Sequence, residues 1–241
     1  MRSFLTILTF FTRIPFIKVE FNEKTFSKGI KWTPFVGLII GLILFAVSFS
    51  LQVFQPNIVN IIILLTYILI TGGLHLDGLS DTFDGIFSGR DRDRMLEIMR
   101  DSRVGTYGVL SLGFWILSMF VVLNYLPREA LIVFPIVGKS APMLSAYVGD
   151  YVRKEGLGKI FASSIGKIEL SFAFIIPIIA SIILGFSGVL AVLVSLIAVY
   201  LMTKYFVKVI GGITGDTMGA VCELSQLCFL FILYFTQGAF S

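Results

Sequence analysis

The chain has 241 residues, of which 56% are hydrophobic and only 14% are charged, and its mean hydropathy is +0.94. A water-soluble globule of this length needs more polar surface than these residues provide, so a soluble protein is excluded. The net charge of +4 follows from an uneven placement of basic residues, described below, and requires no nucleic-acid partner.

The first segment predicts a short helix at the membrane surface. Residues 1–15 contain an apolar run that is too short to cross a bilayer, and no small-residue cleavage site follows it, so a signal peptide is not expected. We expect this helix to end at Arg13-Ile14-Pro15. Residues 1–32 then form a cytoplasmic or interfacial N-terminal segment.

Hydropathy predicts about seven membrane spans, each near the roughly 20 residues that a bilayer requires. The fold class is therefore all-α, a polytopic transmembrane helical bundle that forms a single integral-membrane catalytic domain over residues 1–241. The predicted spans are 33–54, 57–74, 107–126, 129–148, 169–186, 188–203 and 219–237.

Basic residues alternate between the connections. The N-terminal segment and the second, fourth and sixth connections carry six, five, four and two of the 19 Lys and Arg residues, and Arg128 alone lies in the other connections. The positive-inside rule makes the basic segments cytoplasmic, with the N-terminus inside and the C-terminus outside the inner membrane. Lys139 lies within a predicted span, where it is either a functional cation or a lysine that snorkels to the interface.

The chemistry concentrates between Thr71 and Tyr107, a stretch with seven of the 15 acidic residues and five basic residues. We expect residues 75–106 to form a cytoplasmic catalytic loop. Asp77, Asp81 and Asp84 are spaced i, i+4, i+7, so on a helix they share one face. Carboxylates this close repel one another unless a cation lies among them, and oxygen ligands suit Mg²⁺ or Mn²⁺. The alternative is a solvated acidic face, although apolar residues rather than Lys or Glu separate these aspartates.

Residues beside the aspartates predict phosphate binding. Gly78 and Gly85 each follow an aspartate and leave room for a phosphate to approach the backbone. Farther along, Asp101 and Arg103 precede a glycine-rich turn, where they would supply a metal ligand or base and a phosphate clamp. Residues 95–99 suggest an amphipathic helix on the membrane, on which neighbouring charges such as Arg94 and Glu97 are equally explained as an ion pair.

Three further polar residues are candidates. His75, the only histidine, is either a general base or a structural hydrogen-bonding residue, and on an unbroken helix it points about 160° away from Asp77. Asp216 follows Gly211-Gly212 with the same spacing that separates Gly72-Gly73 from Asp77, which suggests a duplicated element. Glu223 lies inside a predicted span, where an ionisable residue is a functional candidate by default.

The motifs resemble those of the cobalamin synthase (adenosylcobinamide-GDP ribazoletransferase) family. The central match is GGLHLDGLSDTFDG followed by GRDRDRMLEIMRDSRVGTYG. Shorter matches are FFTRIP (Phe10 to Pro15), TPFVGLIIG (Thr33 to Gly41), EGLGKIF (Glu155 to Phe161) and GGITGDTMGA (Gly211 to Ala220).

The resemblance implies a transferase of substituted phosphate groups that requires Mg²⁺. It would join α-ribazole, or its 5′-phosphate, to adenosylcobinamide-GDP and release GMP, the last step of nucleotide-loop assembly in cobalamin synthesis. In this hypothesis Asp77, Asp81, Asp84 and Asp216 bind metal, Asp84, Asp101, Arg103 and His75 act in catalysis, and Arg90, Arg103, Lys139, Gly78 and Gly85 bind the phosphates.

Two positions depart from the family pattern. Lys139 stands where an arginine is common, which keeps the charge and loses the bidentate fork. Gln226 stands where an acid often follows, which weakens a metal role there and leaves Asp216 unaffected.

Two rival functions make different predictions. A CDP-alcohol phosphotransferase that makes phospholipid head groups has an Ala-Arg pair after its first Asp-Gly block, whereas Gly85 is followed here by Ile86-Phe87-Ser88. A cation-coupled transporter places its acids near mid-membrane, whereas these acids lie with arginines outside the hydropathy peaks. Besides its two substrates and the lipid bilayer, the sequence leaves a homo-oligomer open as a partner.

Overall fold

The computed structural model describes residues 2–14 and 19–237, and the regular structure of these residues is helical. Pro15 and Lys18, which entered the sequence predictions, lie outside the described residues. The helices are α1 (Arg2–Phe11), α2 (Glu23–Gly29), α3 (Thr33–Ser50), α4 (Pro56–Thr71), α5 (Leu74–Ile86), α6 (Arg92–Ile98), α7 (Thr106–Val122), α8 (Ala130–Val148), α9 (Leu157–Ser163), α10 (Lys167–Ser181), α11 (Gly185–Ile210) and α12 (Gly215–Gln237), with short 3₁₀ turns at Ile30–Trp32, Leu123–Tyr125 and Ile182–Leu184. The all-α prediction is confirmed.

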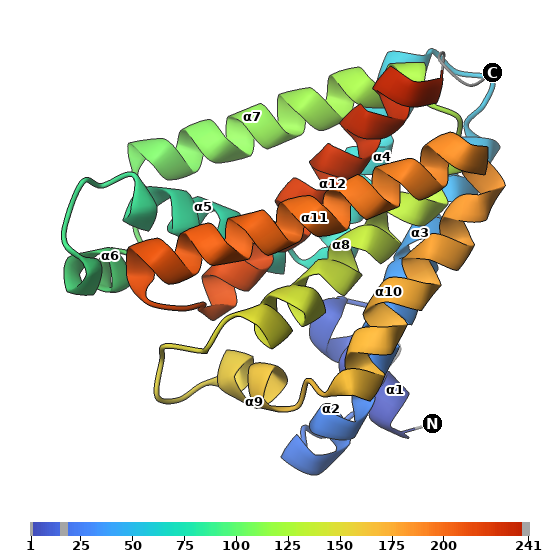
Figure 1. Ribbon diagram of the computed structural model, residues 1–241. Coiled ribbons are helices and arrows are strands. Elements are labelled where there is room, and N and C mark those ends of the chain that lie inside the picture. The colour runs from blue at the N-terminus through green and yellow to red at the C-terminus, as the bar shows by residue number, and fades with distance from the viewer. Residues whose placement is uncertain (1, 15–18, 238–241) are drawn as a thin grey trace.

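In the described part of the chain, five helical segments are long and apolar enough to cross a membrane, and a sixth is gained if α4 and α5 form one broken span. One of the five, Lys167–Ile210, has 44 residues and runs through α10 and α11. Its helix turns at Gly185, whose φ of 66° is readily adopted by glycine, and Figure 1 shows α10 and α11 meeting there at a corner. The prediction of a polytopic bundle is confirmed, whereas the count of seven spans stays a prediction.

The predicted span 57–74 ends earlier than hydropathy suggests. Gly72 and Gly73 have φ values of 64° and 69°, a left-handed conformation that terminates α4 at Thr71. The chain then turns by 90° into α5. Helix α5, which carries the aspartates, therefore runs in a different direction from α4.

A similar break separates α11 from α12. Gly211 ends α11 with a φ of 79°, and Gly212 follows with a φ of 158°. The repeated spacing noticed in the sequence therefore corresponds to the same local event, in which a glycine pair ends one helix and an aspartate lies in the first turn of the next. Common ancestry of the two elements stays a prediction.

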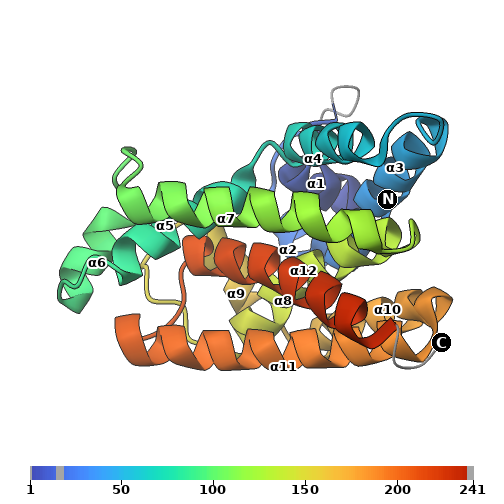
Figure 2. The same ribbon diagram turned by 90° about the horizontal axis from the view of Figure 1, so that it is seen from above.

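Helix α8 is the central helix of the bundle and packs against α3, α10, α11 and α12. Gly37 and Gly41 of α3 allow close contact, because a Cβ atom at either would meet the backbone of α8 around Ile132 or Pro135. Figure 2 shows α7, α12 and α11 running alongside one another at one side of the molecule.

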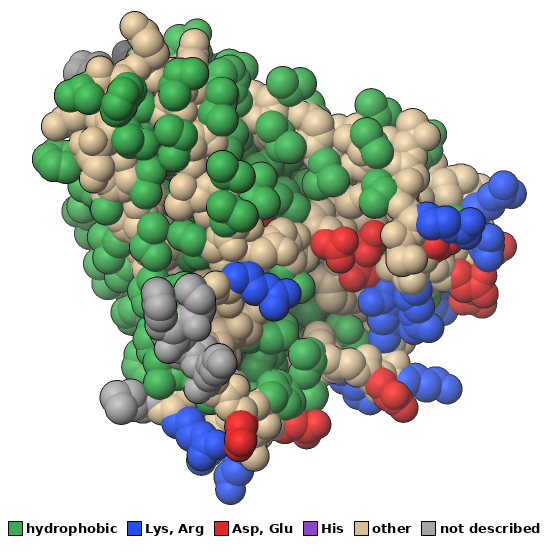
Figure 3. Space-filling view, turned by 180° about the vertical axis from the view of Figure 1, so that it is seen from behind, with side chains coloured by type: hydrophobic (Ala, Val, Ile, Leu, Met, Phe, Trp, Pro, Cys, Tyr) green, Lys and Arg blue, Asp and Glu red, His purple; other side chains and the backbone are tan. Residues whose placement is uncertain are grey.

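The surface divides into an apolar part and a charged part. Large hydrophobic side chains are exposed along the outer faces of α4, α7, α10 and α11. In Figure 3, Lys, Arg, Asp and Glu side chains gather toward the right and lower edges of the view, whereas the upper left shows many hydrophobic and no charged side chains. This division is expected of a protein whose apolar part is embedded in lipid.

Candidate active site

The site is organised around a close crossing of α5 and α12. A Cβ atom at Gly78 would lie 2.9 Å from the backbone oxygen of Asp216 and 3.3 Å from the Cα atom of Gly219. Side chains at these glycines would push the helices apart, so the crossing depends on their absence. The backbone of α12 therefore lies in the space that was predicted beside Gly78. The crossing brings the face of α5 that carries the aspartates close to Asp216.

The three aspartates of α5 lie on one helix, as their spacing predicts. Asp81 is half-buried and within electrostatic range of four charged residues. Two of them come from its own helix and two come from elements far along the chain. These four residues are Asp77, Asp84, Arg153 and Asp216.

Asp84 holds the start of α7. Its two carboxylate oxygens accept hydrogen bonds from the backbone N–H groups of Gly105, at 2.7 Å, and Gly108, at 2.8 Å. Free N–H groups at a helix N-terminus favour a carboxylate, so this contact stabilises the helix end. The catalytic and metal-binding roles expected for Asp84 stay predictions, beside a structural role that the spacing did not reveal.

Asp216 forms an ion pair with Arg153, whose Nη2 lies 2.5 Å from Oδ2. Arg153 comes from the segment between α8 and α9, and its Nε is buried without a partner among the described residues. Sequence analysis missed this arginine, which counted there only as one basic residue of a cytoplasmic connection. The EGLGKIF motif begins two residues later, at Glu155, and does not include Arg153.

The start of α12 is fixed by two threonines. The Thr214 hydroxyl accepts the N–H of Thr217, and the Thr217 hydroxyl accepts the N–H of Thr214, at 3.1 and 2.8 Å. This reciprocal cap satisfies backbone groups that the first turn leaves free. It fixes Asp216 in that turn, beside the start of α5.

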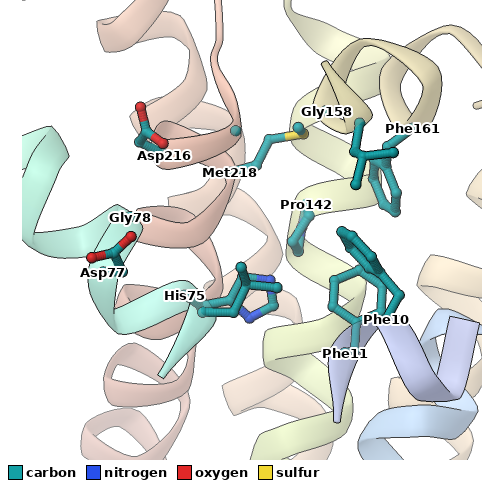
Figure 4. A pocket seen from close by; sticks show the side chains of 13 residues that line it. Phe10, Phe11, His75, Asp77, Gly78, Pro142, Gly158, Phe161, Asp216 and Met218 are labelled. Atoms are coloured by element: carbon teal, nitrogen blue, oxygen red, sulfur yellow. The ribbon is translucent and has the colours of Figure 1, made fainter. Parts of the chain in front are cut away.

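A cavity of about 260 Å³ opens beside the crossing (Figure 4). Asp77 and Asp216 lie on one side of it, and His75 lies at its edge. Phenylalanines from α1 and α9 face them from the other side. The lining residues are Phe10, Phe11, Leu74, His75, Asp77, Gly78, Pro142, Leu157, Gly158, Phe161, Gly215, Asp216 and Met218.

His75, which lines this cavity, contacts the buried Lys139. Lys139 Nζ lies 2.7 Å from His75 Nδ1, and Lys139 is 1% exposed, so the lysine does not snorkel to the interface. An ammonium group donates and never accepts, so Nδ1 accepts and the ring hydrogen lies on Nε2. In this state His75 offers a donor at its other nitrogen, which opposes its expected role as the general base.

Glu223 completes the buried network. Its carboxylate accepts hydrogen bonds from the Tyr67 hydroxyl at 2.8 Å and from Gln226 Nε2 at 3.0 Å, and it lies 4.0 Å from His75 Nδ1. The Lys139 ammonium and the Glu223 carboxylate are thus both buried beside His75, where each offsets the charge of the other. Gln226, noted as a departure from the family pattern, is a hydrogen-bonding member of this network.

The donor sets distinguish two metal hypotheses. Among the described residues, one group of three or more His, Cys, Asp or Glu side chains has all its potential ligand atoms within 4.8 Å of one another. This group is His75, Cys222 and Glu223. Lys139 already places an ammonium beside this group, 3.9 Å from Cys222 Sγ, so a second cation does not fit. The aspartates do not form such a closed group. Mg²⁺ typically takes one or two carboxylates, waters and substrate phosphates, and the oxygens of Asp77 and Asp81 fit that pattern.

Other predicted residues lie apart from the cavity lining. Asp101 and Arg103 form an ion pair with each other at 2.7 Å, and the Arg103 side chain is 87% exposed. The Arg103 hydrogen bonds lower the pKa of Asp101 to about 2, which makes this carboxylate a weak proton acceptor near neutral pH. Arg90 is exposed, and Gly85 faces Met99 of the segment after α6. Their expected roles in binding phosphate stay predictions.

Comparison with known proteins identifies the family. A model of the cobalamin-5-phosphate synthase family matches residues 3–234. This chain belongs to that family. It is 41% identical to an adenosylcobinamide-GDP ribazoletransferase of Acetivibrio thermocellus, over 97% of this chain and 98% of the relative. Proteins of the same name from Alkaliphilus oremlandii and Escherichia coli are each 38% identical, over 99% and 96% of this chain and 99% of each relative.

Membership in the cobalamin-5-phosphate synthase family confirms the resemblance found in the motifs. It sets aside the CDP-alcohol phosphotransferase and the cation-coupled transporter as families for this chain. No solved structure gives a significant match to the chain.

Proposed function

We propose that this chain is a Mg²⁺-dependent adenosylcobinamide-GDP ribazoletransferase of cobalamin synthesis. The observation that carries the proposal is the cavity at the α5–α12 crossing, in a chain of the cobalamin-5-phosphate synthase family. Asp77 and Asp216 line this cavity near the first turns of their helices. Helix N-termini favour bound phosphate, and carboxylates hold the metal that accompanies a pyrophosphate.

The reaction replaces a phosphoanhydride bond with a phosphodiester bond. A ribose hydroxyl of α-ribazole that its 5′-phosphate form also leaves free attacks the phosphorus of the phosphate that is bonded to cobinamide. A new P–O bond forms, the P–O bond to the GMP phosphate breaks, and GMP leaves with the electron pair. The acceptor hydroxyl loses its proton. Since such transfers depend mainly on positioning and on neutralising charge, the residues around the pyrophosphate determine the rate.

Asp77 and Asp81 are the residues that would hold Mg²⁺. When bound there, the ion neutralises charge on the pyrophosphate oxygens. Asp77 is exposed at the cavity, so its oxygens are accessible to a ligand. Mn²⁺ would bind the same oxygen ligands.

In this proposal Arg153 acts on the phosphate and Asp216 acts on the attacking hydroxyl. The Arg153 guanidinium donates to Asp216, which lines the cavity, so its positive charge lies close to the phosphate that we place there. Asp216 accepts the proton of the ribazole hydroxyl. This assignment moves the phosphate clamp from Arg103 to Arg153, because Arg103 is exposed and paired with Asp101.

The proposed location is the cytoplasmic face of the inner membrane. The support is the alternation of basic connections along the sequence and the gathering of charged side chains away from the apolar surface in Figure 3. Adenosylcobinamide-GDP carries a charged pyrophosphate, so this location gives it access from the cytoplasm.

The test is GMP release by detergent-purified protein supplied with adenosylcobinamide-GDP, α-ribazole and Mg²⁺. Release that requires both substrates, is abolished by EDTA and returns with added Mg²⁺ is expected. Asp81→Asn is expected to lower kcat by about 100-fold or more, since it removes a charged ligand at the transferred phosphate. Asp93→Asn, on the exposed face of α6, serves as the control. A folded wild-type protein that releases no GMP with either form of the acceptor would refute the proposal.

A further inference from the structure

The cavity has two chemically different halves (Figure 4). On one side lie Asp77 and Asp216. On the other, three aromatic rings are gathered from α1 and α9: the ring centroids of Phe10 and Phe11 are 4.7 Å apart, and those of Phe11 and Phe161 are 6.2 Å apart. Edge-on rings at these spacings form a wall against which a flat group can lie.

This wall is tied to the aspartate-bearing side. The backbone N–H of Arg13, just after α1, donates to the carbonyl oxygen of Ile70 at 2.6 Å, in the last turn of α4. The Phe11 ring also contacts His75 of α5, with their centroids 5.4 Å apart. The aromatic half is therefore held at a set distance from the carboxylates by direct contacts.

We propose that the aromatic half is the subsite for the base of the acceptor nucleoside, the dimethylbenzimidazole of α-ribazole. The inference rests on the function proposed above and adds a location for one of the two substrates. With its base against Phe10, Phe11 and Phe161, the nucleoside extends its ribose hydroxyls toward Asp77 and Asp216.

The chemistry of the wall discriminates between the two bases in the reaction. Guanine carries a carbonyl, a ring N–H and an amino group, each of which requires a hydrogen-bond partner when buried. Among the described residues that line the cavity, His75 and the two aspartates supply the polar side chains. Dimethylbenzimidazole has no polar exocyclic group and a single free ring nitrogen, so burial against an apolar wall costs it less than it costs guanine. The corrin ring is far larger than a cavity of about 260 Å³ and remains outside it.

Steady-state kinetics of Phe161→Ala and Phe10→Ala test this subsite. Phe161 is 4% exposed and packs in the core, so the half-buried Phe10 provides a second variant whose folding is less affected. We expect KM for α-ribazole to rise about fivefold or more in each, since base–aromatic stacking contributes at least this factor. We expect KM for adenosylcobinamide-GDP to stay within about twofold. Phe35→Ala, at a separate hollow beside Trp32, is the matched control and should change neither constant.

The opposite pattern would overturn the inference. A rise of KM for adenosylcobinamide-GDP alone would place guanine in the aromatic half. Unchanged KM values in folded variants would show that neither substrate binds against these rings. Equilibrium dialysis with α-ribazole separates this inference from the proposed reaction. Binding by the wild type that weakens in Phe10→Ala supports the subsite even if no GMP is released, and absence of binding refutes it.

Discussion

Arg153 is the residue whose role the structure changes most. Its guanidinium pairs with Asp216, whereas Arg103, favoured by its motif, pairs with Asp101 at the surface. Arg153→Gln is expected to lower kcat/KM for GMP release by about 100-fold, because it removes a charged donor at the phosphate. Arg153→Lys should recover part of the rate, since lysine keeps the charge and loses the fork.

The paired control is Arg103→Gln. Its kcat/KM for GMP release is expected to stay within about threefold of the wild-type value, because loss of an exposed ion pair has little effect. If Arg103→Gln instead abolishes GMP release and Arg153→Gln does not, the phosphate clamp lies where the sequence motif placed it.

Lys139 and Glu223 are expected to be coupled. Each is 1% exposed, and removal of one partner leaves the other as an unbalanced buried charge. Lys139→Met should destabilise the fold by about 3–5 kcal/mol, as when a buried pair is broken. The double variant Lys139→Met/Glu223→Gln should be more stable than Lys139→Met alone. Thermal unfolding in detergent measures both, and additive losses would show that the two residues are independent.

At the scale of single residues, the sequence predicted the acidic residues of the site better than the basic residues that pair with them. The spacing of Asp77, Asp81 and Asp84 placed them on one helix face, because a helical period determines which side chains share a face. The pairing of Arg153 with Asp216 joins residues 63 positions apart. Local patterns contain no information on such a contact.

Among the elements, the crossing of α5 and α12 determines the geometry of the site. Gly78→Ala places a Cβ atom 2.9 Å from a backbone oxygen, so the helices must separate. We expect at least about a tenfold loss of GMP release, because displaced catalytic groups lose their alignment. Gly113→Ala is the matched control in α7, where an added Cβ meets nothing within 4 Å. Similar activity of the two variants would show that the close crossing is dispensable.

The boundaries of α4 and α10 show where hydropathy stops being informative. A window of apolar residues extended the second span to residue 74, whereas backbone conformation at Gly72 and Gly73 ends it at Thr71. The predicted spans 169–186 and 188–203 meet at residue 187, whereas the chain turns two residues earlier, at Gly185. Composition thus predicts the presence of apolar helices, and glycine conformation determines their ends.

For the whole molecule, the predicted topology assigns each connection to one side of the membrane. Single cysteines at Ser102 and Glu155 are expected to react with an impermeant thiol reagent only from the cytoplasmic side. Cysteines at Gln55 and Arg128 should react from the outside. All four positions are exposed, and the reactions are measured in intact cells and in inverted vesicles.

The native Cys228 is replaced by serine for this measurement, and the buried Cys222 is retained. Reaction of Ser102→Cys and Gln55→Cys from the same side would contradict the alternation of the connections.

The buried pair has a consequence for how the protein is made. Lys139 lies in α8, whereas Glu223 lies in α12, which is synthesised later. Until α12 emerges from the ribosome, the lysine has no compensating carboxylate in the bilayer, and an isolated charge there is costly. Insertion of α8 to its final depth therefore depends on late translation, and a chain truncated before α12 should be removed by quality-control proteases.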